Sequence, residues 1–200
     1  QKPVRTQHIL ALALSDDELK ERSQTRSFDI KTFEARMKTG EPWVRLIQAH
    51  LYFDHVLSAM LSEALANPEA ITASRIGFAQ KVQLISAMGL LAPDLISPIE
   101  VVNSLRNKIA HRLDFIIAEQ DVRNLENCVP RALRDTMIDF EGRASDQKLE
   151  LHELLVVLLL QVEIVRQGLA HQRLNYRQAT LRLRAELGKA APFLKSGNTQ

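Results

Sequence analysis

The sequence predicts an all-α protein, an antiparallel helical bundle with peripheral N-terminal helices and a long C-terminal helix. Only 7 of the 200 residues are Gly and 7 are Pro, whereas Leu and Ala are abundant, and this composition favours helices. Apolar residues recur at helical spacing, and no stretch alternates long enough to form a strand. We expect one domain, with a core over about 42–165, peripheral helices over 1–40, and a basic C-terminal helix and tail over 166–200.

The first half of the chain predicts peripheral helices followed by two core helices. Residues 16–38 are charged and weakly amphipathic, as one or two peripheral helices would be. A Gly-Glu-Pro break at 40–42 places proline in the first turn of a long helix over about 42–66, which ends at Pro68. A second core helix is expected over 75–90, with a glycine at its C-cap. The apolar stripe of the long helix comprises Leu46, Phe53, Leu57, Met60, Leu61 and Ala64.

The second half predicts three more helices. One is expected over 95–114 and another over 121–138, where Asp121 is a suitable N-cap. Residues 142–146 predict a loop, and the pattern stays helical from about 146 to 190. The stripe of this last helix comprises Leu151, Leu155, Leu158, Val162, Val165 and Leu169.

Charge and cysteine content place few limits on function. The net charge of +2 is too small to indicate a nucleic-acid partner by itself. The single cysteine, Cys128, fits a reducing compartment and, without Cys or His at zinc spacing, is expected as a small buried side chain. The richest apolar run, 154–160, is too short to span a bilayer, and residues 9–14 give way to charge too soon for a secretory signal. We therefore expect a cytoplasmic protein without a membrane span, cofactor or metal.

The most informative segment is 105–111, which reads Leu-Arg-Asn-Lys-Ile-Ala-His. At 100° per residue Leu105 lies on the core face, and Arg106 and His111 mark the edges of a polar sector of about 140° that includes Asn107. A guanidinium can hold a phosphate bidentately, and an imidazole can transfer protons near neutral pH. Together they are the minimum set for metal-free cleavage of an RNA backbone. The alternative is an ordinary solvated helix face.

This motif and the helix before it resemble the HEPN superfamily. The mark of that family is Arg, a polar residue that is often Asn, about three further residues and then His, which Arg106, Asn107 and His111 match. The amphipathic stretch 78–91, which ends in a Gly-Leu turn, is similar to the branch that includes the mannitol operon regulators. The likeness covers roughly residues 42–165.

The resemblance implies a metal-independent RNA endonuclease of the toxin or phage-defence type, which leaves 2′,3′-cyclic phosphate and 5′-OH ends. His111 would be the general base or acid, Arg106 would stabilise the phosphorane-like transition state, and Asn107 would orient His111 or the phosphate. Such sites commonly form across a two-fold homodimer through the motif helix. The implied partners are RNA, a second copy of the chain, and an antitoxin or regulatory protein.

The family also leaves other functions open. Toxin members that are silenced by nucleotidyltransferase antitoxins have Tyr two residues after the His, where this chain has Leu113, so we do not expect that mode of silencing. Some relatives lack the catalytic pair and act as regulators or scaffolds. The alternatives are a non-catalytic transcription or stress regulator that binds protein or nucleic acid, and a helical adaptor whose basic last helix binds an acidic protein.

Two further groups of residues carry weaker signals. His50 and Asp54 are i,i+4 partners near the core stripe, which predicts either a mutually satisfied pair or a second layer that orients Arg106 or His111. Arginines spaced along one face of the last helix indicate either RNA binding or a face that is solvated or paired with the acidic segment 16–21. The residues expected to contact RNA are Lys108, Arg112, Arg166, Arg173, Arg177 and Arg184. The aromatic residues Tyr176, Trp43 and Phe53 are expected in the core, with Leu169 and Leu183 beside Tyr176. The alternative for Tyr176 is stacking on an RNA base.

Overall fold

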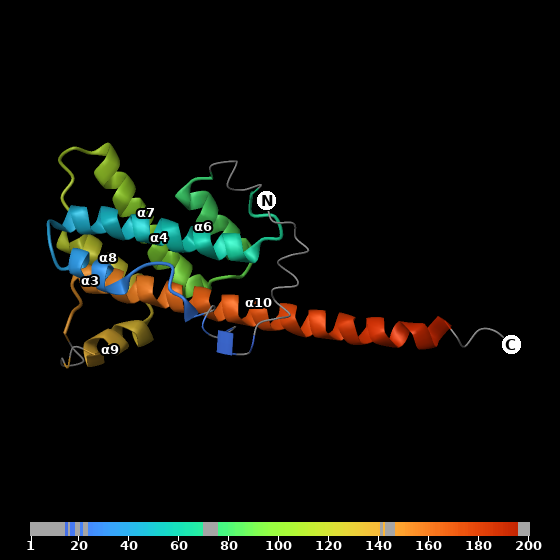
Figure 1. The fold of residues 1–200 in the computed structure, drawn as a ribbon. Helices are drawn as coiled ribbons and strands as arrows, with labels where there is room; N and C mark the ends of the chain where they lie inside the picture. Colours follow the sequence, from blue (N-terminus) through green and yellow to red (C-terminus); the bar gives the residue numbers. More distant parts are fainter. Residues whose placement is uncertain are drawn as a thin grey trace. The chain divides into compact units, whose positions relative to one another are not determined.

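The computed structural model describes residues 15, 17–18, 21, 24–69, 76–140, 142 and 147–195. Within these residues the regular structure is helical and includes no strand (Figure 1), which confirms the predicted all-α class with a long C-terminal helix. The chain falls into two compact units, one formed by residues 26–166 and the other by residues 1–25 together with 167–200. The predicted single domain stays a prediction.

The helices follow one another with short connections in the described part of the chain. They are α3 (Ile30–Met37), α4 (Pro42–Ala64), α6 (Phe78–Ala87), α7 (Pro93–His111), α8 (Glu119–Cys128), α9 (Arg131–Phe140) and α10 (Leu151–Lys195). All of them except the last part of α10 belong to the unit formed by residues 26–166.

Local sequence explains where α3 begins and how the chain turns into α4. The side chain of Asp29 caps α3 by accepting a hydrogen bond of 2.6 Å from the backbone N–H of Thr32. Gly40 turns the chain with a φ of 85°, which glycine adopts at little cost. Pro42 then begins α4, so the predicted break over 40–42 is confirmed.

Helix α4 lies at the centre of the unit formed by residues 26–166 and packs against α3, α6 and α7. Five of the six residues of its predicted stripe are buried, whereas Ala64 is half-buried. Helices α7 and α10 contribute their own apolar faces to the same core, which explains why periodicity alone locates these helices. The largest contributors include Leu46, Phe53, Leu57, Ile99, Leu125, Leu154 and Leu155.

The single helix predicted over 121–138 is wrong, because the structure divides this stretch into α8 and α9. Val129, which precedes Pro130, is extended with φ −72° and ψ 129°, as the steric demand of a following proline favours. Asp121 is also not the N-cap. It is the third residue of α8, and its carboxylate accepts a hydrogen bond of 3.1 Å from the backbone N–H of Ala118.

Helix α10 is more apolar than the short run 154–160 suggests. Among the described residues, Leu151–Leu187 is long and apolar enough to cross a membrane by length and composition, with a window of 18 residues at mean hydropathy 1.5. Half of that window is buried within the structure. The core helix of a bundle has the same character, and the buried stripe of Leu154, Leu158 and Val162 accounts for it here.

Three residues expected in the core are exposed instead. Trp43 is 50% exposed, and Tyr176 and Leu183 on α10 are 76% and 56% exposed. Phe53 is fully buried, as predicted. The seven-residue spacing of Tyr176 and Leu183 indicates a common helix face, but it does not show whether another element covers that face.

Candidate functional site

Helices α4, α6 and α7 surround a cleft of about 660 Å³. This cleft lies wholly within the unit formed by residues 26–166, and it contains two of the three predicted catalytic residues and both residues predicted as a second layer. It is lined by Ile47, His50, Leu51, Asp54, Ile76, Gly77, Phe78, Ala79, Gln80, Lys81, Asn103, Arg106, Asn107 and Ala110.

Helix α7 presents Arg106 and Asn107 to the cleft. Pro93 begins this helix and Leu105 is buried against the core, so the polar sector opposite Leu105 faces the cleft. The Nη1 atom of Arg106 donates a hydrogen bond of 3.2 Å to the side-chain oxygen of Asn107. No carboxylate within the described residues forms an ion pair with Arg106, so its charge is available to an anion.

The imidazole in the cleft is that of His50. Its Nε2 atom lies 3.2 Å from the side-chain oxygen of Asn103, and its ring stacks on Phe78 with centroids 4.1 Å apart. Burial lowers the pKa of His50 below its ordinary value of 6.5; the hydrogen bond to Asn103 opposes this shift, and the charge of Arg106 adds to it. The net shift favours the neutral imidazole at pH 7.

Asp54 and Lys81 form an ion pair across the cleft between α4 and α6. The Nζ atom of Lys81 lies 2.7 Å from Oδ1 of Asp54, and the Lys81 side chain is only 15% exposed. His50 and Asp54 therefore have different partners, and the alternative of a mutually satisfied pair is not what the structure contains. Whether His50 and Asp54 orient Arg106 or His111 during a reaction stays a prediction.

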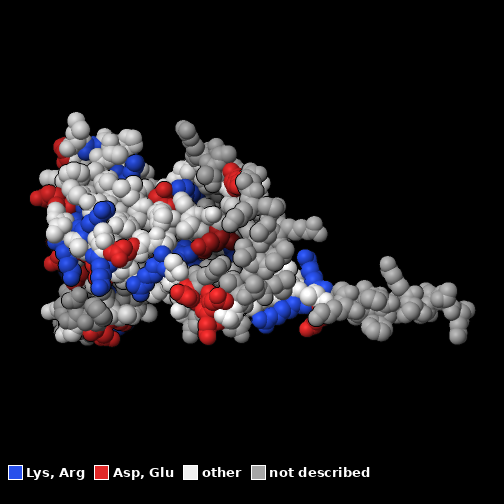
Figure 2. All heavy atoms as spheres, in the orientation of Figure 1, with Lys and Arg blue, Asp and Glu red and all other residues white. Residues whose placement is uncertain are grey.

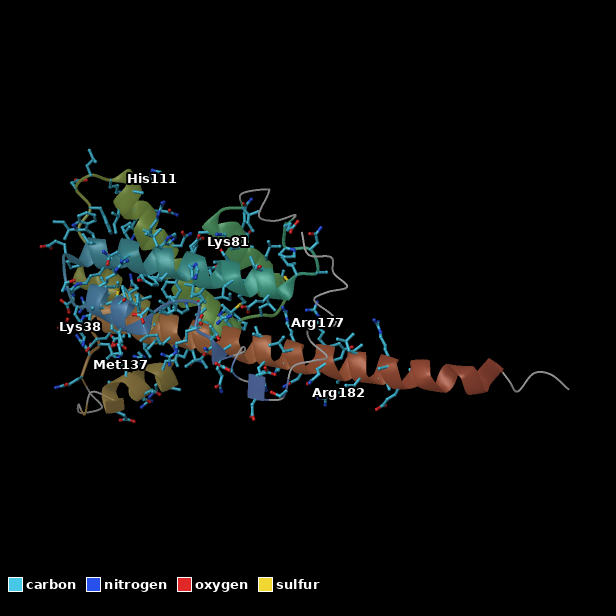
Figure 3. The ribbon with its side chains drawn as sticks, viewed as in Figure 1. Lys38, Lys81, His111, Met137, Arg177 and Arg182 are labelled. Atoms are coloured by element: carbon cyan, nitrogen blue, oxygen red, sulfur yellow. The ribbon has the colours of Figure 1, made fainter. Side chains whose placement is uncertain are left out.

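His111 lies outside the cleft. It is the last residue of α7 (Figure 3), it is exposed, and its imidazole makes no hydrogen bond to another described residue. Arg112, which follows, is already extended, with φ −133° and ψ 110°. Because His111 comes five residues after Arg106, it lies about 7.5 Å farther along the helix axis. Arg106 and His111 therefore lie at different positions along the axis of α7 and at opposite edges of its polar sector.

The charged residues predicted to contact RNA are distributed differently. Nζ of Lys108 pairs with Asp121 at 3.1 Å and lies over the ring of Phe115, whereas Arg112 is exposed. Acidic and basic side chains are interspersed on the face of the molecule that Figure 2 shows. In the unit that contains residues 167–200, Arg177 and Arg184 are exposed and Arg173 is half-buried; Figure 3 labels Arg177 on α10.

The placement of Arg166 on an exposed basic stripe is wrong. Arg166 is 4% exposed, and two of its guanidinium nitrogens donate to the carboxylate of Glu163 at 2.8 and 2.9 Å. A third contact, from Nη1, joins it to Glu63. Arg166 keeps helical spacing from the other arginines, but α10 belongs to the core at this residue. The Arg166 side chain is therefore paired inside the protein and cannot contact RNA.

Helix α6 contributes Phe78, Ala79, Gln80 and Lys81 to the cleft, and sequence reasoning missed the two that make specific contacts there, Phe78 and Lys81. Both belong to the stretch that resembles the HEPN family, and their i,i+3 spacing places them on one face of a helix. Only tertiary packing brings that face against His50 and Asp54 of α4.

Comparisons with known proteins found no matching family model, no matching curated protein and no matching solved structure. The resemblance to the HEPN superfamily therefore depends on the motif at residues 105–111 and the helix before it. The all-α fold is compatible with that resemblance but is common to many proteins.

Proposed function

We propose that this chain is a metal-independent RNA endonuclease of the HEPN type that acts as a homodimer. The observation that carries the proposal is Arg106, a cation without a carboxylate partner in the described structure, beside Asn107 at a cleft large enough for a nucleotide. His111 supplies an exposed imidazole on the same helix. A guanidinium that is free to bind phosphate and a nearby proton carrier are what transesterification of RNA requires.

In the proposed reaction the 2′-oxygen of the RNA attacks the adjacent phosphorus and the bond from phosphorus to the 5′-oxygen breaks. His111 acts either as the base, which removes the 2′-OH proton while water protonates the departing 5′-oxygen, or as the acid, which protonates the 5′-oxygen while water takes the 2′-OH proton. Arg106 stabilises the negative charge on the phosphorane-like transition state. Asn107, which accepts a hydrogen bond from Arg106, orients this guanidinium. The products carry 2′,3′-cyclic phosphate and 5′-OH ends.

A second candidate function is a non-catalytic regulator of the same fold that binds protein or nucleic acid. The observation that favours it is the position of His111 outside the cleft, with no hydrogen bond to hold its ring among the described residues. A catalytic imidazole is usually oriented by a partner, so within one copy of the chain the motif is only partly assembled.

The experiment that tests the proposal is cleavage of structured and single-stranded RNA in excess EDTA. We expect cleavage by the parent protein, with cyclic-phosphate ends, and a loss of about a hundredfold or more in both Arg106→Ala and His111→Ala. Arg123→Ala is the matched control, because Arg123 is a surface arginine paired with Glu119 at 3.1 Å. Nucleic-acid or protein binding that survives His111→Ala, without cleavage of a broad RNA pool, would support the regulator instead.

A further inference from the structure

We propose that the cleft between α4, α6 and α7 is a base-recognition site for one nucleotide, with the phosphate at Arg106 and the base stacked on Phe78, next to the Asp54–Lys81 pair. The inference deepens the proposed ribonuclease and rests on it only for the claim that this nucleotide belongs to RNA. The residues that carry it lie on three helices of one compact unit.

The phosphate end of the site is defined by charge. Lys81 is already paired with Asp54 at 2.7 Å, whereas the side-chain hydrogen bond of Arg106 among the described residues is to the neutral amide of Asn107. Among the described residues the cleft therefore carries one positive charge without an anionic partner. This charge belongs to Arg106, whose planar fork matches phosphate oxygens. Ala110, one turn after Arg106, also lines the cleft and leaves room on the side toward His111.

The base end of the site is defined by aromatic rings. His50 and Phe78 stack at 4.1 Å with an angle of 30° between their planes, and both line the cleft together with the apolar Ile47 and Leu51. Flat bases bind single-stranded nucleic-acid sites by stacking on such rings. His50 is 8% exposed and packs behind the half-buried ring of Phe78, so Phe78 offers the stacking surface. The lowered pKa of His50 keeps the ring behind it neutral at pH 7.

The polar groups at the base end favour bases that carry an amino group. The Oδ1 atom of Asp54 accepts from Lys81, and its second oxygen has no hydrogen bond within the described structure. A carboxylate oxygen accepts from the exocyclic amino groups of cytosine, adenine and guanine. On uracil the single N3–H donor lies between two carbonyl oxygens, which repel a carboxylate. Asn103 adds a side-chain amide whose oxygen already contacts His50. We therefore expect uracil to be the poorest ligand.

The cleft residues of α7 lie at known distances along the helix axis from the motif residue His111. Asn103 lies eight residues before His111, about 12 Å along the helix axis, and Arg106 lies between them. A nucleotide whose base reaches the level of Asn103 places its phosphate near Arg106, on the side of His111. The cleft thus selects the base next to the phosphate that the proposed reaction cleaves.

The inference is tested by direct binding of AMP, CMP, GMP and UMP to the full chain. Calorimetry and NMR measure the binding, and the protein is the His111→Ala variant, in which no cleavage is expected. We expect saturable binding, with UMP weakest. Arg106→Gln should weaken all four nucleotides by about tenfold, because it removes a charge-assisted contact to phosphate. Asp54→Asn should reduce the preference against UMP, since an amide can also donate to the carbonyl oxygens of uracil.

A blocking variant keeps the test independent of the contact residues. Ala110 is exposed and lines the cleft, whereas Ser104 is exposed on the same helix and does not line it. Ala110→Trp should abolish nucleotide binding and Ser104→Trp should not, with circular dichroism confirming that both fold.

The outcomes separate this inference from the proposed function. Nucleotide binding that Ala110→Trp removes, in a protein that cleaves no RNA, would support the base-recognition site and contradict the ribonuclease. RNA cleavage without mononucleotide binding, unaffected by Asp54→Asn and Ala110→Trp, would support the ribonuclease and overturn the site. Equal binding of all four bases in both the parent and Asp54→Asn would overturn the role of Asp54.

Discussion

At the scale of single residues, Arg166 and Glu163 form the most deeply buried ion pair described in the structure. Arg166 is 4% exposed and Glu163 is 2% exposed. Glu163 also accepts hydrogen bonds from the backbone N–H of Ser27 at 2.7 Å and from its hydroxyl at 2.8 Å, and Arg166 contacts Glu63 on α4. The pair thus joins α10, α4 and the segment before α3, and its charges are compensated as buried charges must be.

Glu163→Gln should therefore destabilise the protein strongly. The substitution removes the anion that accepts two hydrogen bonds from Arg166 and so takes a carboxylate partner away from a buried guanidinium. Breaking a buried pair in this way costs about 3 kcal/mol. Urea unfolding followed by circular dichroism measures the change, and Glu100→Gln, on the exposed side of α7, is the control expected to change stability by less than about 0.5 kcal/mol.

The same pair predicts a dependence of stability on pH. Burial alone would raise the pKa of Glu163, but hydrogen bonds from Arg166 and Ser27 outweigh it and hold the pKa below the ordinary 4.5. A lowered pKa in the folded state means stability that is present above pH 4.5 and is lost as pH falls through the folded pKa. The stability difference between the parent and Glu163→Gln should shrink in that acidic range; a difference that stays constant down to pH 3 would contradict the assignment.

Residue spacing could predict the polar face of α7 but not which side chains of that face line the cleft. A helical wheel places Arg106, Asn107 and His111 in one polar sector, because the angle around the helix axis depends only on position in the sequence. Which of them lines the cleft depends on where α4 and α6 cross α7, and this crossing excludes His111 and brings in His50 instead. Tertiary packing is not encoded in the spacing of seven residues.

At the scale of elements, the turn between α6 and α7 depends on the backbone freedom of Gly89. Its φ is 64°, and the N–H of Leu90 donates to the carbonyl of Ile85 at 3.0 Å, as in a Schellman C-cap. A methyl group at Gly89 would meet no atom within 4 Å, so the cost of substitution is conformational and not steric. This glycine could be predicted from the sequence, because a C-cap position has one strong preference.

Gly89→Ala should lower the free energy of unfolding by about 1 kcal/mol, because alanine resists a positive φ. Gly89→Asn should lose less, since asparagine tolerates this conformation better. Gly168→Ala is the matched comparison, for which we expect a change in the free energy of unfolding of the opposite sign. Gly168 lies inside α10 with open space around it, and alanine should stabilise the helix by up to about 1 kcal/mol. Thermal or urea unfolding measures all three; a stabilised Gly89→Ala would contradict the turn.

Periodicity could predict that the helices exist, but it could not always predict what covers them. The stripe of α4 becomes core because α3, α6 and α7 pack against it. Tyr176 and Leu183 repeat the same pattern on α10 and are exposed. The division of 121–138 at Pro130 could have been read from the sequence, since a proline disfavours helical geometry in the residue before it, whereas the exposure of Tyr176 could not.

At the scale of the whole molecule, the separation of Arg106 from His111 bears on the proposed homodimer. Arg106 borders the cleft, whereas His111 is exposed at the end of α7 and is followed by two exposed apolar residues, Leu113 and Ile116. A two-fold axis beside this end would bury both apolar side chains and could bring His111 of one copy toward Arg106 of the other. A site that combines Arg106 of one copy with His111 of the other can be distinguished by experiment from a site within one copy.

Mixing the inactive variants Arg106→Ala and His111→Ala should restore RNA cleavage if the site is composite. In a mixed dimer, the intact Arg106 of one copy meets the intact His111 of the other at one of the two sites. Random exchange makes about half of the dimers mixed, so activity should return to about a quarter of the parent's. Light scattering measures the oligomeric state. The double substitution Leu113→Glu with Ile116→Glu should shift the protein toward monomer and abolish the recovery of activity. The control Leu183→Glu on α10 should change neither. Dimers that exchange without any recovery would place Arg106 and His111 of the same copy in one site.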